Sequence, residues 1–350
     1  MLEIFLIALS SLMVSSVRAD ALSEWDQYEK QVKDQHREHV KAQFEKWESY
    51  KKRVIEKWND GAIPEEKIYV EYFDNDLTRI KVDYENGVVE AETLQDLKSA
   101  NLEEAKSSIQ KALVSVIDSN NSSSSILNQD EVLNSKTSVV EEVDSYLKNT
   151  QDLAQTKGSD NVVREHYKVT FKLAPNYIKL RAEKFKPTVE EWAKKYNLDP
   201  AFVFAIIRQE SSFNPRARSQ VGAIGLMQIM PKYAGKEVMQ TVTGKTAEPD
   251  QETLYDPSKN IMFGTTYLQL LRDKHFPEIK DPEKSMYLMT ASYNWGPDRI
   301  KNSIKKGRIS TRGPAAAVFD QIIKIAPEET KGYLKKVREY KELFSQKDEI

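Results

Sequence analysis

An apolar run that leads into a single glutamate constrains the fold of this chain more than any other feature. Residues Ala201–Ile207 read AFVFAII, and they follow Asp199 and Pro200. Aspartate at the N-cap with proline at the first helical position is a helix start signal. Apolar residues occur on every side of this helix, so we expect it to be buried all round. Pro215 ends the helical stretch, because proline disfavours helix at its own position and the one before.

Glu210 is the ionisable group that this helix places in an unusual environment. It lies three, four and seven residues after Ile207, Ile206 and Val203, so helical spacing puts its carboxyl group on their apolar face. Desolvation raises the pKa of a carboxyl group, and the partial negative charge of a helix C-terminal end acts in the same direction. The sequence therefore predicts a carboxyl group that is protonated near neutral pH, as a general acid requires.

Four motifs follow one another in the second half of the chain. They are Glu210-Ser211, Ser219, the GLMQ segment 225–228 and the ASYNWG segment 291–296. In this order they resemble the lytic transglycosylase (SLT) domain, a lysozyme-like fold that cleaves the glycan strands of peptidoglycan. Segment 68–94 also resembles the N-terminal domain of the membrane-bound lytic murein transglycosylase C family. That family is anchored as a lipoprotein through a cysteine, and this chain has no cysteine.

The SLT resemblance implies a reaction that needs only one carboxyl group. Glu210 would protonate the glycosidic oxygen and then, as a carboxylate, take the proton from the C6 hydroxyl of the N-acetylmuramyl (MurNAc) ring. The product would be a 1,6-anhydro sugar released without water. The resemblance also implies a set of substrate-binding residues: Ser219, Met227, Gln228, Tyr293, Asn294 and Tyr333. Trp295 stands where the family usually has a small residue.

The residue types alone leave other roles open for these positions. Ser219 is also what a solvated loop would carry, and Met227 suits core packing as well as an apolar wall for a sugar ring. Gln228 follows an apolar pair, so its amide needs partners from the protein or from an acetamido group. Tyr293 also fits a half-buried tyrosine of the core.

Glycoside cleavage normally uses two carboxylates on opposite faces of the sugar bond. The other candidate acids, Glu237, Asp250, Glu252 and Asp256, lie in polar, loop-like sequence that does not suggest a fixed position beside Glu210. Two alternatives remain open. One is a goose-type lysozyme, which uses the same scaffold to hydrolyse the bond. The other is a catalytically silent peptidoglycan-binding protein that keeps the groove.

Composition limits the chemistry and the partners. The absence of cysteine excludes disulfides and thiolate chemistry. The first 160 residues carry a net charge of −12, whereas the rest carry 33 basic and 23 acidic residues, a net +10. A basic half suits a polyanionic partner such as peptidoglycan, and no basic-aromatic motif supports nucleic acid. We expect no cofactor and no metal site, since the four histidines, His36, His39, His166 and His275, are scattered.

The fold class predicted is α+β, with three parts in chain order. Residues 1–19 resemble a signal peptide cut after Ala19, although a buried N-terminal helix is the alternative. Residues 20–174 form a mixed helix and strand domain, and residues 175–350 an all-α lysozyme-like catalytic domain. We therefore expect a periplasmic or envelope protein that is not a lipoprotein. The amphipathic segment 21–58 packs on its own domain or makes a peripheral membrane contact, and the oligomeric state stays open.

Local patterns predict the individual elements. Asn86 and Gly87 indicate a type I′ hairpin, and Thr188 with Glu191 after Pro187 indicates the start of a helix. The strands expected are 67–73, 77–85, 88–94 and 166–173; the helices expected before the catalytic domain are 95–117 and 131–148, with breaks at 120–125 and 155–160.

Overall fold

The computed structural model describes residues 45, 48–118, 125–128, 131, 143, 145 and 154–346. Residues 1–61 with 158–161 form one compact unit, and residues 62–157 with 162–350 form another. The predicted signal peptide lies outside the described residues, as do most of the predicted helices 21–58 and 131–148 and most of the predicted break 120–125. Of the first unit, residues 48–57 are helical, and the backbone N–H of Asp160 donates to the carbonyl of Glu56 at 3.2 Å.

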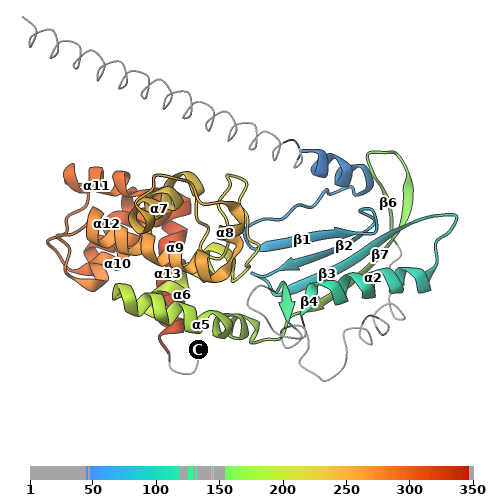
Figure 1. Cartoon of the computed structure of the whole chain (residues 1–350), viewed down its shortest axis with the longest axis horizontal. Coiled ribbons are helices and arrows are strands. Elements are labelled where there is room, and N and C mark those ends of the chain that lie inside the picture. Colours follow the sequence, from blue (N-terminus) through green and yellow to red (C-terminus); the bar gives the residue numbers. More distant parts are fainter. Residues whose placement is uncertain are drawn as a thin grey trace, which may run out of the picture. The chain divides into compact units, whose positions relative to one another are not determined.

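The second unit begins with strands and ends with helices, as the α+β prediction requires (Figure 1). Its strands are β1 Ile68–Phe73, β2 Thr78–Asp83, β3 Val88–Asp96, β4 Ile117–Asp118, β5 Leu127–Asn128, β6 Ala154–Lys157 and β7 Val163–Lys172. Its helices and π-helical turns are α2 Leu102–Val116, α5 Tyr177–Tyr196, α6 Pro200–Ser211, η1 Pro231–Gly235, α7 Lys236–Thr243, α8 Gln251–Tyr255, α9 Pro257–Leu270, η2 Leu271–His275, α10 Pro282–Trp295, α11 Pro297–Lys305, α12 Ala315–Ile325 and α13 Glu328–Phe344.

Five strands form one antiparallel sheet in the order β1-β2-β3-β7-β6, and β4 pairs with β5 in a short parallel ladder. Strand alternation places Ile80, Val82 and Tyr84 of the β2 segment on one face, where they pack with the buried stripe of α2. Figure 1 shows α2 running along this face of the sheet. The sheet and α2 thus enclose a core of their own.

Three predictions about the sheet region are wrong in detail. Residues Ala154–Lys157 pair with β7 as an edge strand, so the break predicted from 155 is partly strand. The helix expected from residue 95 starts at Leu102, because the side chain of Asn101 caps it and β3 runs on to Asp96. The expected type I′ turn is a four-residue connection, since the Asp83 side chain accepts the N–H groups of Glu85 and Asn86.

The helical part is built around α6. All residues from Ala201 to Ile207 are buried, and α6 packs against α5 and α13. Asp199 caps the helix by accepting the N–H of Ala201 at 2.9 Å, which confirms the start signal. Asp256 and Asp281, each followed by proline, cap α9 and α10 in the same way.

The helix start predicted at Thr188 is wrong. Helix α5 runs without a break from Tyr177 to Tyr196 and contains Pro187 in its interior. The residues on both sides of the proline share one buried stripe, which includes Phe185 and Val189. Packing of this stripe outweighs the loss of one backbone hydrogen bond at the proline.

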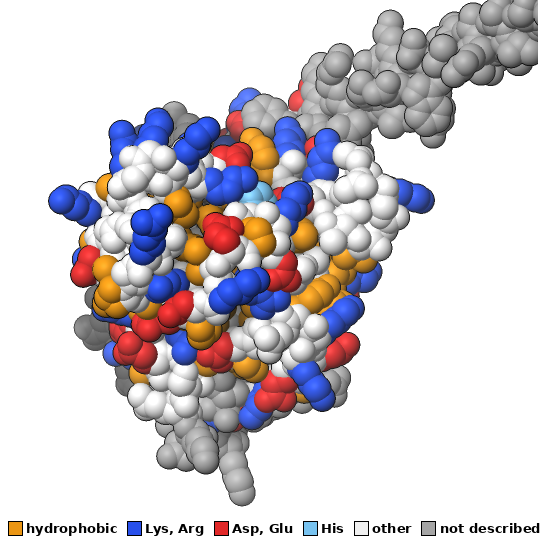
Figure 2. Space-filling model, turned by 90° about the vertical axis from the view of Figure 1, so that its left-hand side faces the viewer, with side chains coloured by type: hydrophobic (Ala, Val, Ile, Leu, Met, Phe, Trp, Pro, Cys, Tyr) orange, Lys and Arg blue, Asp and Glu red, His pale blue; other side chains and the backbone are white. Residues whose placement is uncertain are grey.

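In the view of Figure 2, Lys and Arg side chains are spread over the face with Asp and Glu among them. The positive excess of the second half therefore does not gather in a single patch on this face.

No helix among the described residues has the length and apolar character needed to cross a membrane.

Candidate active site

The candidate site forms where α6 ends. Glu210 lies in the last turn of α6, and the chain then reverses through Ser212 and Phe213, whose φ angles are 48° and 64°. Such positive φ angles are uncommon for residues other than glycine, so this turn is held by its surroundings. The hydroxyl of Ser211 donates to the carbonyl of Leu226 at 2.7 Å and ties the helix end to the GLMQ segment.

The carboxyl group of Glu210 has the environment that the sequence predicts. Burial raises its pKa from the ordinary 4.5 to about 8, and the charges of Glu66 and Glu329 act in the same direction. A hydrogen bond from the Tyr333 hydroxyl, at 2.6 Å, and the charge of Lys67 partly oppose this rise. Desolvation therefore dominates, and the carboxyl group is protonated at neutral pH.

Segment 216–230 forms the second side of the site. Two isolated bridges, Arg218 with Ile224 and Ile224 with Ile229, fold it into a compact loop. Within the loop, the backbone N–H of Ala223 donates to the Ser219 hydroxyl oxygen at 2.9 Å. Gly225 has a φ of +78°, and a Cβ at this position would lie 2.2 Å from the Nδ2 of an asparagine. Only glycine fits here, for reasons of both conformation and space.

That asparagine is Asn260 of α9, which is fully buried. Its Oδ1 accepts the N–H of Met227 at 2.8 Å, and its Nδ2 donates to the carbonyls of Ile224 at 2.9 Å and Leu254 at 2.7 Å. One side chain thus satisfies three backbone groups of the loop and of α8. This arrangement fixes the backbone position of the GLMQ segment.

The predicted binding residues of the GLMQ segment occupy different surroundings. Met227 is fully buried, and a Cβ on Gly264 of α9 would lie 2.2 Å from its sulfur. Gln228 has a φ of 46°, and its Nε2 donates to the carbonyl of Gly225 at 2.9 Å. The Oε1 of Gln228 is buried without a hydrogen-bond partner. A buried acceptor of this kind is suited to a donor from a ligand.

Helices α10 and α13 supply the remaining predicted residues. The Tyr293 hydroxyl donates to the carbonyl of Met227 at 2.8 Å, and burial raises the pKa of Tyr293 well above its usual range. Asn294 accepts from the Thr330 hydroxyl at 2.6 Å and donates to Glu329 at 3.3 Å. Asn294 thus ties α10 to the first turn of α13, the helix that carries Tyr333.

The structure brings Glu210 and Tyr333 into direct contact, and Tyr293 contacts the GLMQ segment. The other acids weighed from the sequence are engaged elsewhere or exposed. Asp250 and Asp256 cap α8 and α9, Glu237 forms an ion pair with Lys274 at 2.8 Å, and Glu252 is exposed.

Three residues were not identified from the sequence: Asn260, and Glu66 and Lys67, which both precede β1. The available signal for Asn260 was a polar amide in an otherwise apolar helical stretch. It lies four residues before Gly264 and therefore on the same face of the helix. No local pattern marks Glu66 and Lys67, because they act on Glu210 only through the tertiary fold.

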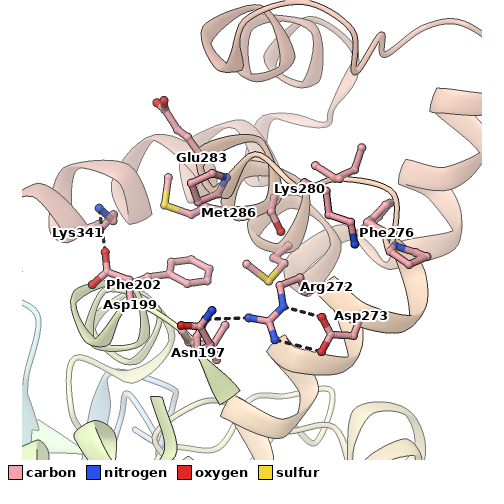
Figure 3. A pocket seen from close by; sticks show the side chains of 16 residues that line it. Asn197, Asp199, Phe202, Arg272, Asp273, Phe276, Lys280, Glu283, Met286 and Lys341 are labelled. Carbon is pink, nitrogen blue, oxygen red and sulfur yellow. Dashed lines mark hydrogen bonds and ion pairs between the residues drawn. The ribbon is translucent and has the colours of Figure 1, made fainter. Parts of the chain in front are cut away.

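A cavity of about 850 Å³ lies at the opposite end of α6 (Figure 3). Asp199, which caps α6, and Phe202 from its first turn line it, together with Arg272, Met286 and Lys341. Figure 3 shows the two hydrogen bonds from Arg272 to the carboxylate of Asp273, and both residues line the cavity. Since Asp199 and Glu210 lie at opposite ends of the same helix, this cavity is separate from the candidate site.

Comparisons with known protein families agree with the motifs of this site. The family described as "Transglycosylase SLT domain" matches residues 187–312. The family described as "Membrane-bound lytic murein transglycosylase C, N-terminal domain" matches residues 33–139.

Two curated relatives match most of this chain. The membrane-bound lytic murein transglycosylase C of Edwardsiella ictaluri is 30% identical over 283 residues, which are 75% of this chain and 75% of that protein. The protein of the same description from Actinobacillus pleuropneumoniae serotype 5b is 28% identical over 303 residues, or 82% of each. A solved structure of an inactive mutant of the lytic transglycosylase Slt from Pseudomonas aeruginosa is 27% identical, with a TM-score of 0.39, and covers 49% of this chain and 28% of its own.

The match to the SLT domain and the two transglycosylase relatives show that this chain is a peptidoglycan lytic transglycosylase. More narrowly, the chain belongs to the membrane-bound lytic murein transglycosylase C family.

The first prediction concerns Asn260. In Asn260→Asp, the carboxylate oxygen that replaces Nδ2 would face the carbonyls of Ile224 and Leu254. Two donor bonds are lost, and a buried carboxylate oxygen faces two carbonyl oxygens, of which only that of Ile224 keeps another donor among the described residues, the N–H of Ile229. We therefore expect a loss of about 2–4 kcal/mol in the free energy of unfolding. Activity on murein should fall with it, because the GLMQ backbone loses its anchor. Denaturant unfolding followed by a turnover assay checks both.

A matched control is Asn302→Asp on α11, which lies in exposed sequence. It should leave stability and turnover within the normal range of a surface change. Native stability in Asn260→Asp would contradict the anchoring role.

Proposed function

We propose that this enzyme cleaves the β-1,4 bond between MurNAc and N-acetylglucosamine (GlcNAc) without water and leaves 1,6-anhydro-MurNAc ends. Glu210 acts as the only acid and base. One observation carries the proposal: a carboxyl group with a pKa of about 8 at the end of a buried helix, hydrogen-bonded by Tyr333. A group with this pKa is protonated at the start of each turnover and able to donate.

In the first step, the Glu210 proton goes to the glycosidic oxygen, and the bond from that oxygen to C1 of MurNAc breaks. Positive charge develops on the MurNAc ring, and the GlcNAc 4-hydroxyl leaves. Glu210 becomes a carboxylate, which the Tyr333 hydroxyl stabilises through its hydrogen bond. The same tyrosine thus makes the loss of the proton easier while burial makes it harder.

In the second step, the C6 hydroxyl oxygen of the same MurNAc ring forms a bond to C1. Its proton goes to the Glu210 carboxylate, which restores the starting acid. Atoms and charge balance without a water molecule. The second carboxylate that a hydrolase needs to activate water has no role in this sequence of steps.

The surrounding residues are proposed to hold the sugar rings. The unpartnered Oε1 of Gln228 is a candidate acceptor for an acetamido N–H. Tyr293 and Asn294 keep the GLMQ segment and α13 in place through the bonds described above, and Ser219 shapes the loop beside the acid. Met227 completes the wall of the site from within the core.

We further propose that the enzyme works in the periplasm or at the cell envelope, where its substrate lies. The proposed division places residues 20–174 in an N-terminal domain and residues 175–350 in the catalytic domain. Residues 1–19, interpreted as a signal peptide, lie outside the described part of the chain.

The second prediction concerns the product. Digestion of purified sacculi should release muropeptides whose muramic acid ends are one water lighter than those from a hydrolase. Glu210→Gln should lower kcat/KM by about 10²–10⁴-fold or more, since it removes the proton donor and the base together. Mass spectrometry of the muropeptides and a turnover assay measure both quantities.

Glu66→Gln and Glu329→Gln are the matched controls, because these two acids influence the pKa of Glu210 without a hydrogen bond to it among the described residues. Each should retain more than about a tenth of the native rate. Reducing muramic acid ends, together with loss of turnover in either control, would instead support a goose-type hydrolase with a second carboxylate.

The third prediction concerns the pH profile. The active form of the free enzyme carries the proton on Glu210, so kcat/KM should be highest below a pKa of about 8 and fall as pH rises through it. Tyr333→Phe removes a hydrogen bond that favours the carboxylate, so the pKa should rise further. The alkaline limb of the profile should therefore move to higher pH while the maximal rate falls.

Tyr287→Phe is the control for this experiment. Tyr287 also donates to a carboxylate, that of Glu283 at 2.6 Å, but in the first turns of α10 and away from Glu210. The alkaline limb of the Tyr287→Phe pH profile should coincide with that of the native enzyme. A limb that stays in place, or moves to lower pH, in Tyr333→Phe would show that this hydroxyl does not act on the catalytic group.

A further inference from the structure

The turn directly after the catalytic helix is held by Arg181, a buried side chain of α5. Ser212 and Phe213 both have positive φ angles, a backbone conformation that residues other than glycine rarely adopt. The carbonyl of Phe213 nevertheless has a fixed partner. Nε and Nη2 of Arg181 donate to it at 3.2 Å and 2.9 Å. These two hydrogen bonds to one carbonyl oxygen fix the course of the chain three residues after Glu210.

The other side of the same guanidinium group contacts the sheet part of the chain, which comprises the residues from just before β1 to the end of β7. Nη1 of Arg181 donates to Glu131 Oε2 at 2.5 Å and to the carbonyl of Ile126 at 3.2 Å. The guanidinium carbon lies 4.3 Å from the centre of the Tyr84 ring. Arg181 is only 1% exposed, so its hydrogen bonds form without competition from water. The charge is neutralised by Glu131, which is itself fully buried.

Two further contacts connect the sheet part with the surroundings of Glu210. Nδ2 of Asn214, the residue after the turn, donates to the carbonyl of Glu66 at 3.2 Å. Lys336, one helical turn beyond Tyr333 on α13, forms an ion pair with Glu85 at 3.3 Å. Both helices whose side chains meet in the Glu210–Tyr333 hydrogen bond are therefore attached to the sheet part. Arg181 makes the most buried of these attachments.

We propose that Arg181 is a positioning residue for catalysis: by binding the Phe213 carbonyl while it is itself held by Glu131 and Tyr84, it fixes the end of α6 so that the Glu210 carboxyl group meets the Tyr333 hydroxyl. The proposal relies on the proposed role of Glu210. It assigns to the sheet part a function in the reaction, beyond its own fold. A displacement of about 1 Å of a reacting group can lower the rate about a hundredfold, so small shifts of this turn matter.

The test compares Arg181→Lys with a matched control, Lys184→Met. A lysine keeps the positive charge for Glu131 but has no planar fork that binds Phe213 and Ile126 at once. Lys184 binds the other oxygen of the Glu131 carboxylate, so its removal perturbs the same buried ion pair. For each variant, kcat, KM, the pH profile and the thermal midpoint are measured on the full chain with murein as the substrate.

For Arg181→Lys we expect kcat to fall at least about tenfold, with KM within about twofold of the native value. The alkaline limb should move to higher pH, because a displaced Glu210 loses the bond from Tyr333. Lys184→Met should keep kcat within about twofold and leave the limb in place, whatever its thermal midpoint. In the double variant Arg181→Lys/Tyr333→Phe, the loss in kcat should be clearly smaller than the product of the two single losses.

The proposal is overturned if Arg181→Lys keeps the native kcat and the native limb, or if the two losses multiply. It is also overturned if Lys184→Met lowers kcat and moves the limb as much as Arg181→Lys does. Failure of the underlying mechanism looks different, because Glu210→Gln would then retain turnover. An inactive Glu210→Gln enzyme together with an unaffected Arg181→Lys enzyme would contradict the positioning role alone.

Discussion

The burial of one carboxyl group at the end of a helix is the interaction on which the rest of this structure depends. Glu210 ends a helix whose run Ala201–Ile207 is buried, and its half-buried carboxyl group is desolvated relative to water. Its pKa rises to about 8, far from the ordinary 4.5. Between these two pH values the folded protein keeps a proton that the unfolded chain releases. Stability therefore falls as pH rises through this window.

The fold tolerates this destabilising group because the elements around it are fixed by independent contacts. Asn260 holds the GLMQ segment from α9, and Tyr293 contacts the same segment from α10. Arg181 holds the turn that follows the helix. Each contact satisfies backbone groups that would otherwise be buried and unpaired. The site is thus rigid around a group that we propose to act by gaining and losing a proton, which is the arrangement expected of a preorganised acid.

The sequence predicted the features that depend on local pattern and failed where tertiary packing decides. Asp-Pro capping predicts the start of α6, Pro215 predicts an end shortly before it, and helical spacing predicts the raised pKa of Glu210; all three are confirmed. The predicted helix start at Thr188 was wrong, because packing of the buried stripe on both sides of Pro187 outweighs the backbone N–H that proline lacks. The edge strand β6 has no alternating apolar pattern, since its side chains are mostly exposed. Arg181 gave no signal, because its partners lie from about 30 to nearly 100 residues away in the chain.

The most direct test of this account is a titration of the Glu210 carboxyl group itself. In protein labelled with ¹³C at the glutamate side-chain carboxyl carbon, the Glu210 resonance is identified by its absence from Glu210→Gln. The account predicts a single titration of this resonance with a pKa near 8, well separated from that of exposed glutamates. A midpoint near the ordinary 4.5 would mean that Glu210 is ionised at neutral pH, and the single-acid mechanism would then be wrong.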